Sequence, residues 1–230
     1  MRPRGRCLLA SLLSSLEAVS SVRTLTCPPG AGPVPDMGRA PRIVLASASP
    51  RRSQLMQEIG LTFDVIPSQV AEEGFSAGCP EELVMRLAHA KAADVAKRLR
   101  SGIVVGADTI VVADGQVMGK PADPADAANM LSALSGREHQ VYSGVAVIDA
   151  ESGRSLTDYE VTAVRFRRLS EAAIQRYVAT GEPMDKAGAY AIQGLGSLLV
   201  TGISGDYNCV VGLPLCKLAA MLSEFGVDTL

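Results

Sequence analysis

From Arg42 onward, apolar and polar positions alternate between short runs typical of buried strands and longer runs with helical periodicity. Proline at the start of a run and glycine after its end mark helix boundaries, as at Pro50 and Gly60. The pattern predicts helices over 50–59, 80–100, 125–134, 171–181 and 213–225, and strands over 43–45, 63–66, 103–107, 109–113, 141–148 and 159–167.

Strands and helices that alternate in this way predict a mixed α/β fold around one twisted sheet. Asp114-Gly115 is a hairpin signal between apolar runs, and Ser170 is placed to cap the helix that follows it. We expect the strand after residue 103 to break at Asp108, because an acid is out of place in a core. The glycine-rich stretch 188–205 gives no clear pattern.

Composition narrows the function classes. The formal net charge is −2 and aromatic residues make up 4% of the chain with no Trp, which argues against nucleic-acid binding. No apolar run is long enough to span a bilayer. The five cysteines contain no CxxC pair and the two histidines cannot complete a zinc site, so we expect reduced thiols in a cytoplasmic protein.

The first forty residues differ in composition from the rest of the chain. They are rich in Arg and Ser and poor in acidic residues, and 28–33 is a Pro/Gly run. We expect residues 1–40 to be an extension, with Met37 as the true start, and residues 41–230 to form one domain. A transit peptide and a secretory signal are the alternatives, since Leu8–Leu16 weakly resembles a signal sequence.

The segment Ala46–Arg52 lies between the first strand and the first helix and is the strongest indication of chemistry. Small residues, including Ser47, lead into the free N–H groups of a helix start, where an anion can bind. Arg51 and Arg52 add forked donors that match phosphate oxygens. The sequence therefore predicts a phosphate-binding loop, with a solvated helix start as the alternative.

Two carboxylates are candidates for catalysis or for binding a metal ion. Asp108 could hold a divalent cation or take a proton from water, and Glu72, in the loop after the second strand, could be a second ligand. A turn residue and a solvated Glu pair are the structural alternatives. Mg²⁺ bound to a nucleotide uses one or two carboxylates together with phosphate oxygens, so this pair suits a nucleotide–metal complex.

Two lysines and an amide complete the set of candidates. Lys91 falls within the apolar stripe of its helix, so its ammonium must snorkel or meet an anion. Lys120 stands in a Gly-Lys-Pro turn that would fix its direction. Gln193, among apolar residues and glycines, can read a donor and an acceptor on a base edge. A surface lysine and a core amide are the structural alternatives for Lys120 and Gln193.

These groups suit a nucleoside triphosphate with a metal ion, but the known motifs of common nucleotide binders are missing. The chain has no GxxxxGK[ST] loop and no GxGxxG after a strand, and it has no GxSxG.

Six short motifs, in order, resemble the Maf family of nucleoside triphosphate pyrophosphatases from about Arg42 to the C-terminus. They are Ser47–Arg52, Ala107–Thr109, Lys120-Pro121, Ser135–Arg137, Asp185–Tyr190 and Val210–Pro214.

The resemblance implies an elongated mixed sheet with two lobes around a deep cleft, related to the inosine triphosphate pyrophosphatases. It also implies a homodimer and a divalent cation, Mg²⁺ or Mn²⁺, in an enzyme that cleaves between the α- and β-phosphates. By this resemblance, Asp108 is the proton acceptor, Lys91 and Lys120 contact phosphate, and Glu72 and Asp108 hold the metal ion.

The resemblance further places Ser47 and Arg51 among the substrate-binding residues, with Arg52, Thr109 and Gln193 at specificity positions. The Gln-Gly ending of the Asp185 motif, with Gln193, is similar to the family branch that acts on dTTP and UTP. The branch that acts on 7-methyl-GTP usually has an acidic residue at this position. We therefore expect a dTTP/UTP pyrophosphatase that cleans the nucleotide pool. Turnover of 7-methyl-GTP or modified pyrimidine nucleotides, and a non-catalytic regulator of cell division, are the alternatives.

Overall fold

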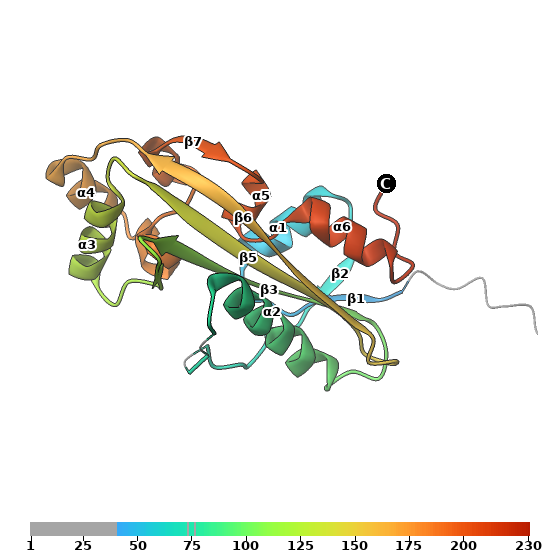
Figure 1. Ribbon diagram of the computed structural model, residues 1–230. Helices are drawn as coiled ribbons and strands as arrows, with labels where there is room; N and C mark the ends of the chain where they lie inside the picture. Colours follow the sequence, from blue (N-terminus) through green and yellow to red (C-terminus); the bar gives the residue numbers. More distant parts are fainter. Residues whose placement is uncertain (1–40, 73, 76) are drawn as a thin grey trace, which may run out of the picture. The chain divides into compact units, whose positions relative to one another are not determined.

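The computed structural model describes residues 41–72, 74–75 and 77–230, so the expectations for residues 1–40 lie outside the described part. A mixed sheet of seven strands dominates it, with helices on both faces (Figure 1). The strands are β1 (Ile43–Leu45), β2 (Phe63–Val65), β3 (Ile103–Ala113), β4 (Gln116–Met118), β5 (Glu138–Asp149), β6 (Ser155–Phe166) and β7 (Val200–Ser204).

The helices fill the connections between strands. They are α1 (Pro50–Glu58), α2 (Pro80–Ala96), α3 (Pro124–Leu134), α4 (Glu171–Val178), α5 (Tyr207–Val211) and α6 (Leu215–Ser223). Three short 3₁₀ helices lie between α4 and β7: η1 (Glu182–Asp185), η2 (Ala187–Ala189) and η3 (Gly194–Leu199). The predicted mixed α/β sheet with flanking helices is confirmed.

The sheet order is β2-β1-β3-β5-β6-β7, with β4 paired to β3. Strand β1 is parallel to β2 and β3, and all other pairs are antiparallel. On one side of β3, β1 pairs with residues 103–105 and β4 with residues 111–113, whereas β5 pairs with nearly the whole length on the other side. Among the described strands, residues 106–110 therefore have a neighbour on one side only, and the cleft described below lies along this gap in the sheet.

Helix α2 packs unusually close to the sheet because two glycines face it. A Cβ atom on Gly106 would lie 2.4 Å from the carbonyl oxygen of Ala88, and one on Gly144 would lie 2.2 Å from that of Val84. No side chain fits at such distances, so the helix backbone rests directly on β3 and β5. This contact brings Lys91 of α2 up to the centre of β3.

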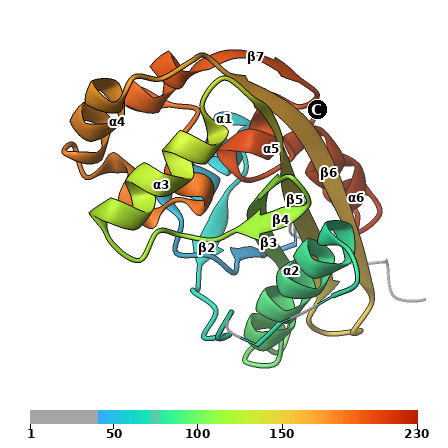
Figure 2. The same ribbon diagram turned by 60° about the vertical axis from the view of Figure 1, so that its left-hand side comes forward.

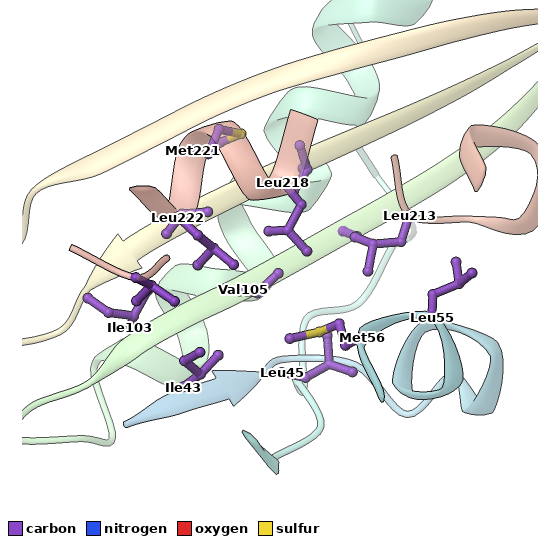
Figure 3. Packing of buried hydrophobic residues seen from close by; sticks show 14 of the residues in the cluster. Ile43, Leu45, Leu55, Met56, Ile103, Val105, Leu213, Leu218, Met221 and Leu222 are labelled. Atoms are coloured by element: carbon purple, nitrogen blue, oxygen red, sulfur yellow. The ribbon is translucent and has the colours of Figure 1, made fainter. Parts of the chain in front are cut away.

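The opposite face is covered by α1 and α6 (Figure 3). Leu55 and Met56 of α1 and Leu218 and Leu222 of α6 are buried against β1 and β3, around Val105. Burial of such side chains contributes roughly 1.5–3 kcal/mol each. The packing of α1 on this face and of α2 on the other face therefore fixes the position of both helices relative to the gap beside β3.

A second apolar cluster lies around α3 and α4, which pack together beyond the start of β5 (Figure 2). It buries Leu131 and Leu134 of α3 and Ile174 and Tyr177 of α4, and it includes Tyr190 from the loop between η2 and η3. The glycine-rich stretch that gave no clear pattern is thus folded as η2, η3 and β7 against this cluster.

Several sequence predictions were wrong in detail. The strand does not break at Asp108, because Asp108 pairs with Gly144 within a continuous β3. Helix α2 ends at Ala96 rather than Arg100, and the last helix begins at Leu215 after an additional helix, α5. The acid is tolerated in β3 because the neighbouring strand is missing on one side and a lysine lies opposite.

Within the described residues, no helix is both long and apolar enough to cross a membrane. The described cysteines, Cys79, Cys209 and Cys216, are free thiols, as predicted.

Candidate functional site

A cleft with a volume of about 490 Å³ lies along the unpaired side of β3. Asp108 and Thr109 of β3 line it, together with the loop 46–52, the loop that carries Glu72, Lys120, and the segment 185–193. All nine residues singled out from the sequence line this one cleft: Ser47, Arg51, Arg52, Glu72, Lys91, Asp108, Thr109, Lys120 and Gln193. The fold therefore gathers residues that are separated by up to 146 positions in the chain (193 − 47).

The acidic centre of the cleft is built around Lys91. Its Nζ lies 2.6 Å from Oδ1 of Asp108 and 2.6 Å from Oε1 of Glu72. The Asp108 and Lys91 side chains are only 8% and 10% exposed, whereas that of Glu72 is 49% exposed. One ammonium thus compensates a buried carboxylate and a half-exposed one, and this contact explains why a lysine stands in the apolar stripe of α2.

The charge of Glu72 is stabilised by its neighbours. Burial alone would raise the pKa of Glu72, but the hydrogen bond and charge of Lys91, with Lys120 and Arg52, lower that pKa below its usual value. Lys120 approaches from the other side, with its Nζ 3.9 Å from Oε2 of Glu72. Glu72 is therefore a carboxylate at neutral pH.

The loop before α1 has the geometry expected of a helix N-terminus. Pro50 occupies the first turn, and the backbone N–H of Ser49 donates to Oγ of Ser47 at 3.2 Å. Arg51 lines the cleft and is partly exposed. The loop thus presents a cation and small polar residues to the same space.

Arg52 is more constrained than the sequence indicated. Its Nε donates to the carbonyl oxygen of Gly212 at 2.9 Å, its Nη1 to Oγ of Ser47 at 3.2 Å, and its Nη2 to Oγ1 of Thr109 at 3.2 Å. Burial lowers the pKa of Arg52, while the charges of Asp108 and Glu72 oppose that shift. Three bonds of a guanidinium with five N–H donors leave two donors for another partner.

Thr109 connects this arginine to the sheet. Its hydroxyl lies 2.7 Å from Oγ of Ser143, which in turn donates to the carbonyl oxygen of Cys209 at 2.8 Å. Ser143 is fully buried and was not found from the sequence, because a serine inside a predicted strand carries no distinguishing pattern. Burial raises the pKa of the Cys209 thiol to about 11, so this cysteine is a neutral packing residue.

Apolar side chains form another part of the cleft wall, which is called the apolar end below. Its residues are Val111, Tyr190, Ile192 and Val210, and Gln193 lines the same cleft. The Gln193 amide has no hydrogen-bond partner within the part of the chain that the structure describes. Sequence reasoning missed Tyr190, which nevertheless stands inside the Asp185–Tyr190 motif.

The oxygen atoms of Glu72 and Asp108 decide whether the acidic centre could bind a divalent cation. The described residues contain no group of three or more His, Cys, Asp or Glu side chains that could hold a metal ion by themselves. Glu72 and Asp108 nevertheless each keep a second carboxylate oxygen beyond the one that contacts Lys91. Two carboxylates completed by phosphate oxygens and water are a usual Mg²⁺ environment, so the residues fit a cation that arrives with a nucleotide.

One cleft of a mixed α/β fold thus combines cations, a buried carboxylate, and apolar side chains with an unpaired amide, a set that suits a phosphorylated nucleotide-like ligand. Residues 42–225 match the family model described as "Maf-like protein". The chain belongs to this family.

Curated relatives are similar over most of their length. A protein of Moorella thermoacetica is 54% identical over 187 residues, which cover 81% of this chain and 96% of the relative. One of Symbiobacterium thermophilum is 53% identical over 185 residues, covering 80% and 94%. Both relatives bear the name dTTP/UTP pyrophosphatase.

Among solved structures, the Staphylococcus aureus Ham1 protein aligns at a TM-score of 0.39 with 17% identity, over 54% of this chain and 71% of that chain.

Proposed function

We propose that this protein hydrolyses dTTP and UTP to the nucleoside monophosphate and pyrophosphate. The observation that carries the proposal is Asp108, a buried carboxylate whose Oδ1 is held 2.6 Å from Nζ of Lys91 inside a cleft lined by Arg51 and Lys120. Relatives that are about half identical to this chain and bear the name dTTP/UTP pyrophosphatase supply the substrate class.

The triphosphate would lie over the cationic end. Arg51, Lys120 and the N–H groups that begin α1 can bind phosphate oxygens, and Lys91 keeps one of its three N–H donors beyond its two carboxylate contacts. These charges stabilise the transition state and the departing pyrophosphate. Glu72 and Asp108 would hold a Mg²⁺ or Mn²⁺ ion, which when bound offsets further phosphate charge.

Asp108 then orients and deprotonates a water molecule. The water oxygen attacks the α-phosphorus, the bond from that phosphorus to the bridging oxygen breaks, and pyrophosphate leaves with the electron pair. The proton passes to the Asp108 carboxylate and from there to solvent. Lys91 holds the Asp108 carboxylate in one direction through the 2.6 Å contact between Nζ and Oδ1.

The base would lie at the apolar end, where Gln193 can pair with one donor and one acceptor of a pyrimidine. A role in clearing the nucleotide pool and a homodimer stay predictions from the family resemblance, and a cytoplasmic location stays a prediction from the cysteine pattern.

Pyrophosphate release from dTTP, UTP, CTP, GTP, ATP and 7-methyl-GTP tests the proposal, with Mg²⁺ or Mn²⁺ and with chelator. We expect metal-dependent release from dTTP and UTP above all others. Turnover of 7-methyl-GTP alone would contradict the specificity and keep the chemistry. Tight nucleotide binding without product would contradict catalysis and favour the regulatory alternative.

A further inference from the structure

Gln193 is held from both sides by two residues that do not belong to the sequence motifs of the cleft. On its N-terminal side, the backbone N–H of Ala191 donates to the hydroxyl of Tyr177 at 3.2 Å. On its C-terminal side, the N–H groups of Leu195 and Gly196 donate to the carboxylate of Glu182 at 3.2 and 3.0 Å. Tyr177 and Glu182 also contact each other, since the Tyr177 hydroxyl donates to Oε1 of Glu182 at 2.9 Å.

Tyr177 and Glu182 are themselves firmly placed. Tyr177 is 6% exposed on α4 and lies within the apolar cluster of α3 and α4. The N–H of Glu182 donates to Oγ1 of Thr180 at 3.1 Å, and its carbonyl oxygen accepts from Lys186 at 3.1 Å. The loop that carries Gln193 is therefore attached to a packed helix rather than to solvent.

The loop closes so tightly that only glycine fits at two places. A Cβ atom on Gly196 would lie 2.2 Å from the carbonyl oxygen of Ala191 and 2.6 Å from the Tyr177 hydroxyl. At Gly194, φ is +67° and a Cβ atom would lie 2.9 Å from Oε2 of Glu182. Gly196 is close to Tyr177 and Gly194 is close to Glu182, so the backbone of this loop packs directly against these two side chains.

We propose that Tyr177 and Glu182 are positioning residues that aim the Gln193 amide at the nucleotide base and so set the preference for dTTP and UTP. This inference rests on the function proposed above. An amide that pairs with a donor and an acceptor must be held in one orientation, and a free 3₁₀ turn would not hold it. The two residues act through the backbone on either side of Gln193, and the acidic centre does not depend on them.

The test is Tyr177→Phe, which keeps the ring and removes the hydroxyl that joins Ala191 to Glu182. Tyr142→Phe is the matched control, since its hydroxyl bonds Gln140 and its ring lies in the cluster on the α2 side of the sheet. Steady-state kinetics with dTTP, UTP and CTP would be measured for both variants. We expect Tyr177→Phe to raise KM for dTTP and UTP about tenfold while kcat stays within about threefold, and Tyr142→Phe to change neither.

A double-mutant cycle with Gln193→Ala separates positioning from general loosening of the fold. In the Gln193→Ala background, Tyr177→Phe should change KM by less than about twofold, because the amide to be aimed is gone. Equal losses in both backgrounds, or no effect of Tyr177→Phe in the wild type, would overturn the inference. If thermal unfolding shows that Tyr177→Phe does not fold, Glu182→Gln takes its place in the same cycle.

The wild type separates this inference from the proposed function. A wild type that releases no pyrophosphate from dTTP or UTP overturns the function, and the inference with it. A wild type that turns over both, beside a Tyr177→Phe variant with an unchanged KM, overturns the inference alone.

Discussion

The two ends of the cleft are built in different ways. At the acidic and cationic end, Arg52, Lys91 and Asp108 come from α1, α2 and β3, elements with regular backbone, whereas Glu72 and Lys120 come from loops. Charged contacts such as Lys91–Asp108 hold this end together. The other end comes from three short 3₁₀ helices and connecting loops, and neutral or singly charged hydrogen bonds to Tyr177 and Glu182 hold it. Regular elements thus carry the central pair Lys91 and Asp108, while a loop shaped by local contacts carries the group proposed for substrate choice.

Asp108→Asn should break the chemical end with the largest effect. The amide is nearly isosteric but cannot accept a proton, so kcat should fall by about 10³-fold while KM for dTTP changes little. Single-turnover pyrophosphate release and a thermal melt would check activity and fold together. Near-normal turnover would remove Asp108 from the mechanism.

Lys91→Met should damage the same end through stability as well as activity. Without the ammonium, the buried Asp108 carboxylate loses the cation that contacts it directly, and the free energy of unfolding should drop by about 3–5 kcal/mol. Urea denaturation would measure the loss. The double variant Lys91→Met with Asp108→Asn should recover part of that stability, because the uncompensated charge is gone; no recovery would refute the charge argument.

His139 allows the apolar end to be tested by pH. It is 3% exposed, and its Nε2 lies 2.8 Å from the Tyr190 hydroxyl. Its Nδ1 has no hydrogen-bond partner among the residues that the structure describes. Burial lowers the pKa of His139 from 6.5 to about 4. Between pH 6.5 and about pH 4, His139 is protonated in the unfolded chain and neutral in the folded one. The contribution of neutral His139 to the free energy of unfolding is therefore fully present above pH 6.5 and is lost as the pH falls to about 4, by about 3 kcal/mol in all.

The measurement is the free energy of unfolding of the wild type and of His139→Phe between pH 4 and 7. The variant keeps a ring against Phe166 and Tyr190, and the groups that titrate elsewhere are common to both proteins. We expect the difference between the two curves to follow the histidine. Parallel curves would show that His139 does not become neutral on folding.

Arg52→Lys should have the smallest effect and would show how far the chemical end depends on hydrogen-bond geometry. Lysine keeps the charge but cannot bond Gly212, Ser47 and Thr109 at once, so the free energy of unfolding should fall by about 1–2 kcal/mol. Arg51→Lys is the stability control, because the Arg51 side chain makes no hydrogen bond to another described residue. Equal losses in both variants would contradict the role given to the fork.

Much of the fold and of the site could be predicted from local pattern. Pro50, Pro80 and Pro124 each stand in the first turn of a helix, because proline there loses no hydrogen bond. The Asp114-Gly115 signal is a real hairpin between β3 and β4, with positive φ at both residues. Lys91 and Asp108 could be singled out because a charge inside an apolar pattern is visible along the chain.

Tertiary structure decided what those residues contact. The position of Lys91 in the stripe of α2 already required an anion or a route to solvent, but that Asp108 and Glu72 are its partners depends on Gly106 and Gly144 letting α2 rest on the sheet. Asp108 was expected at a break in its own strand, whereas β3 is continuous and the gap beside Asp108 lies between β1 and β4. Tyr177 and Glu182 gave no signal, because their role is to bond backbone N–H groups that are distant until the chain folds. The sequence by itself thus determined which groups carry charge and where helices begin, and only long-range packing decided which of them meet.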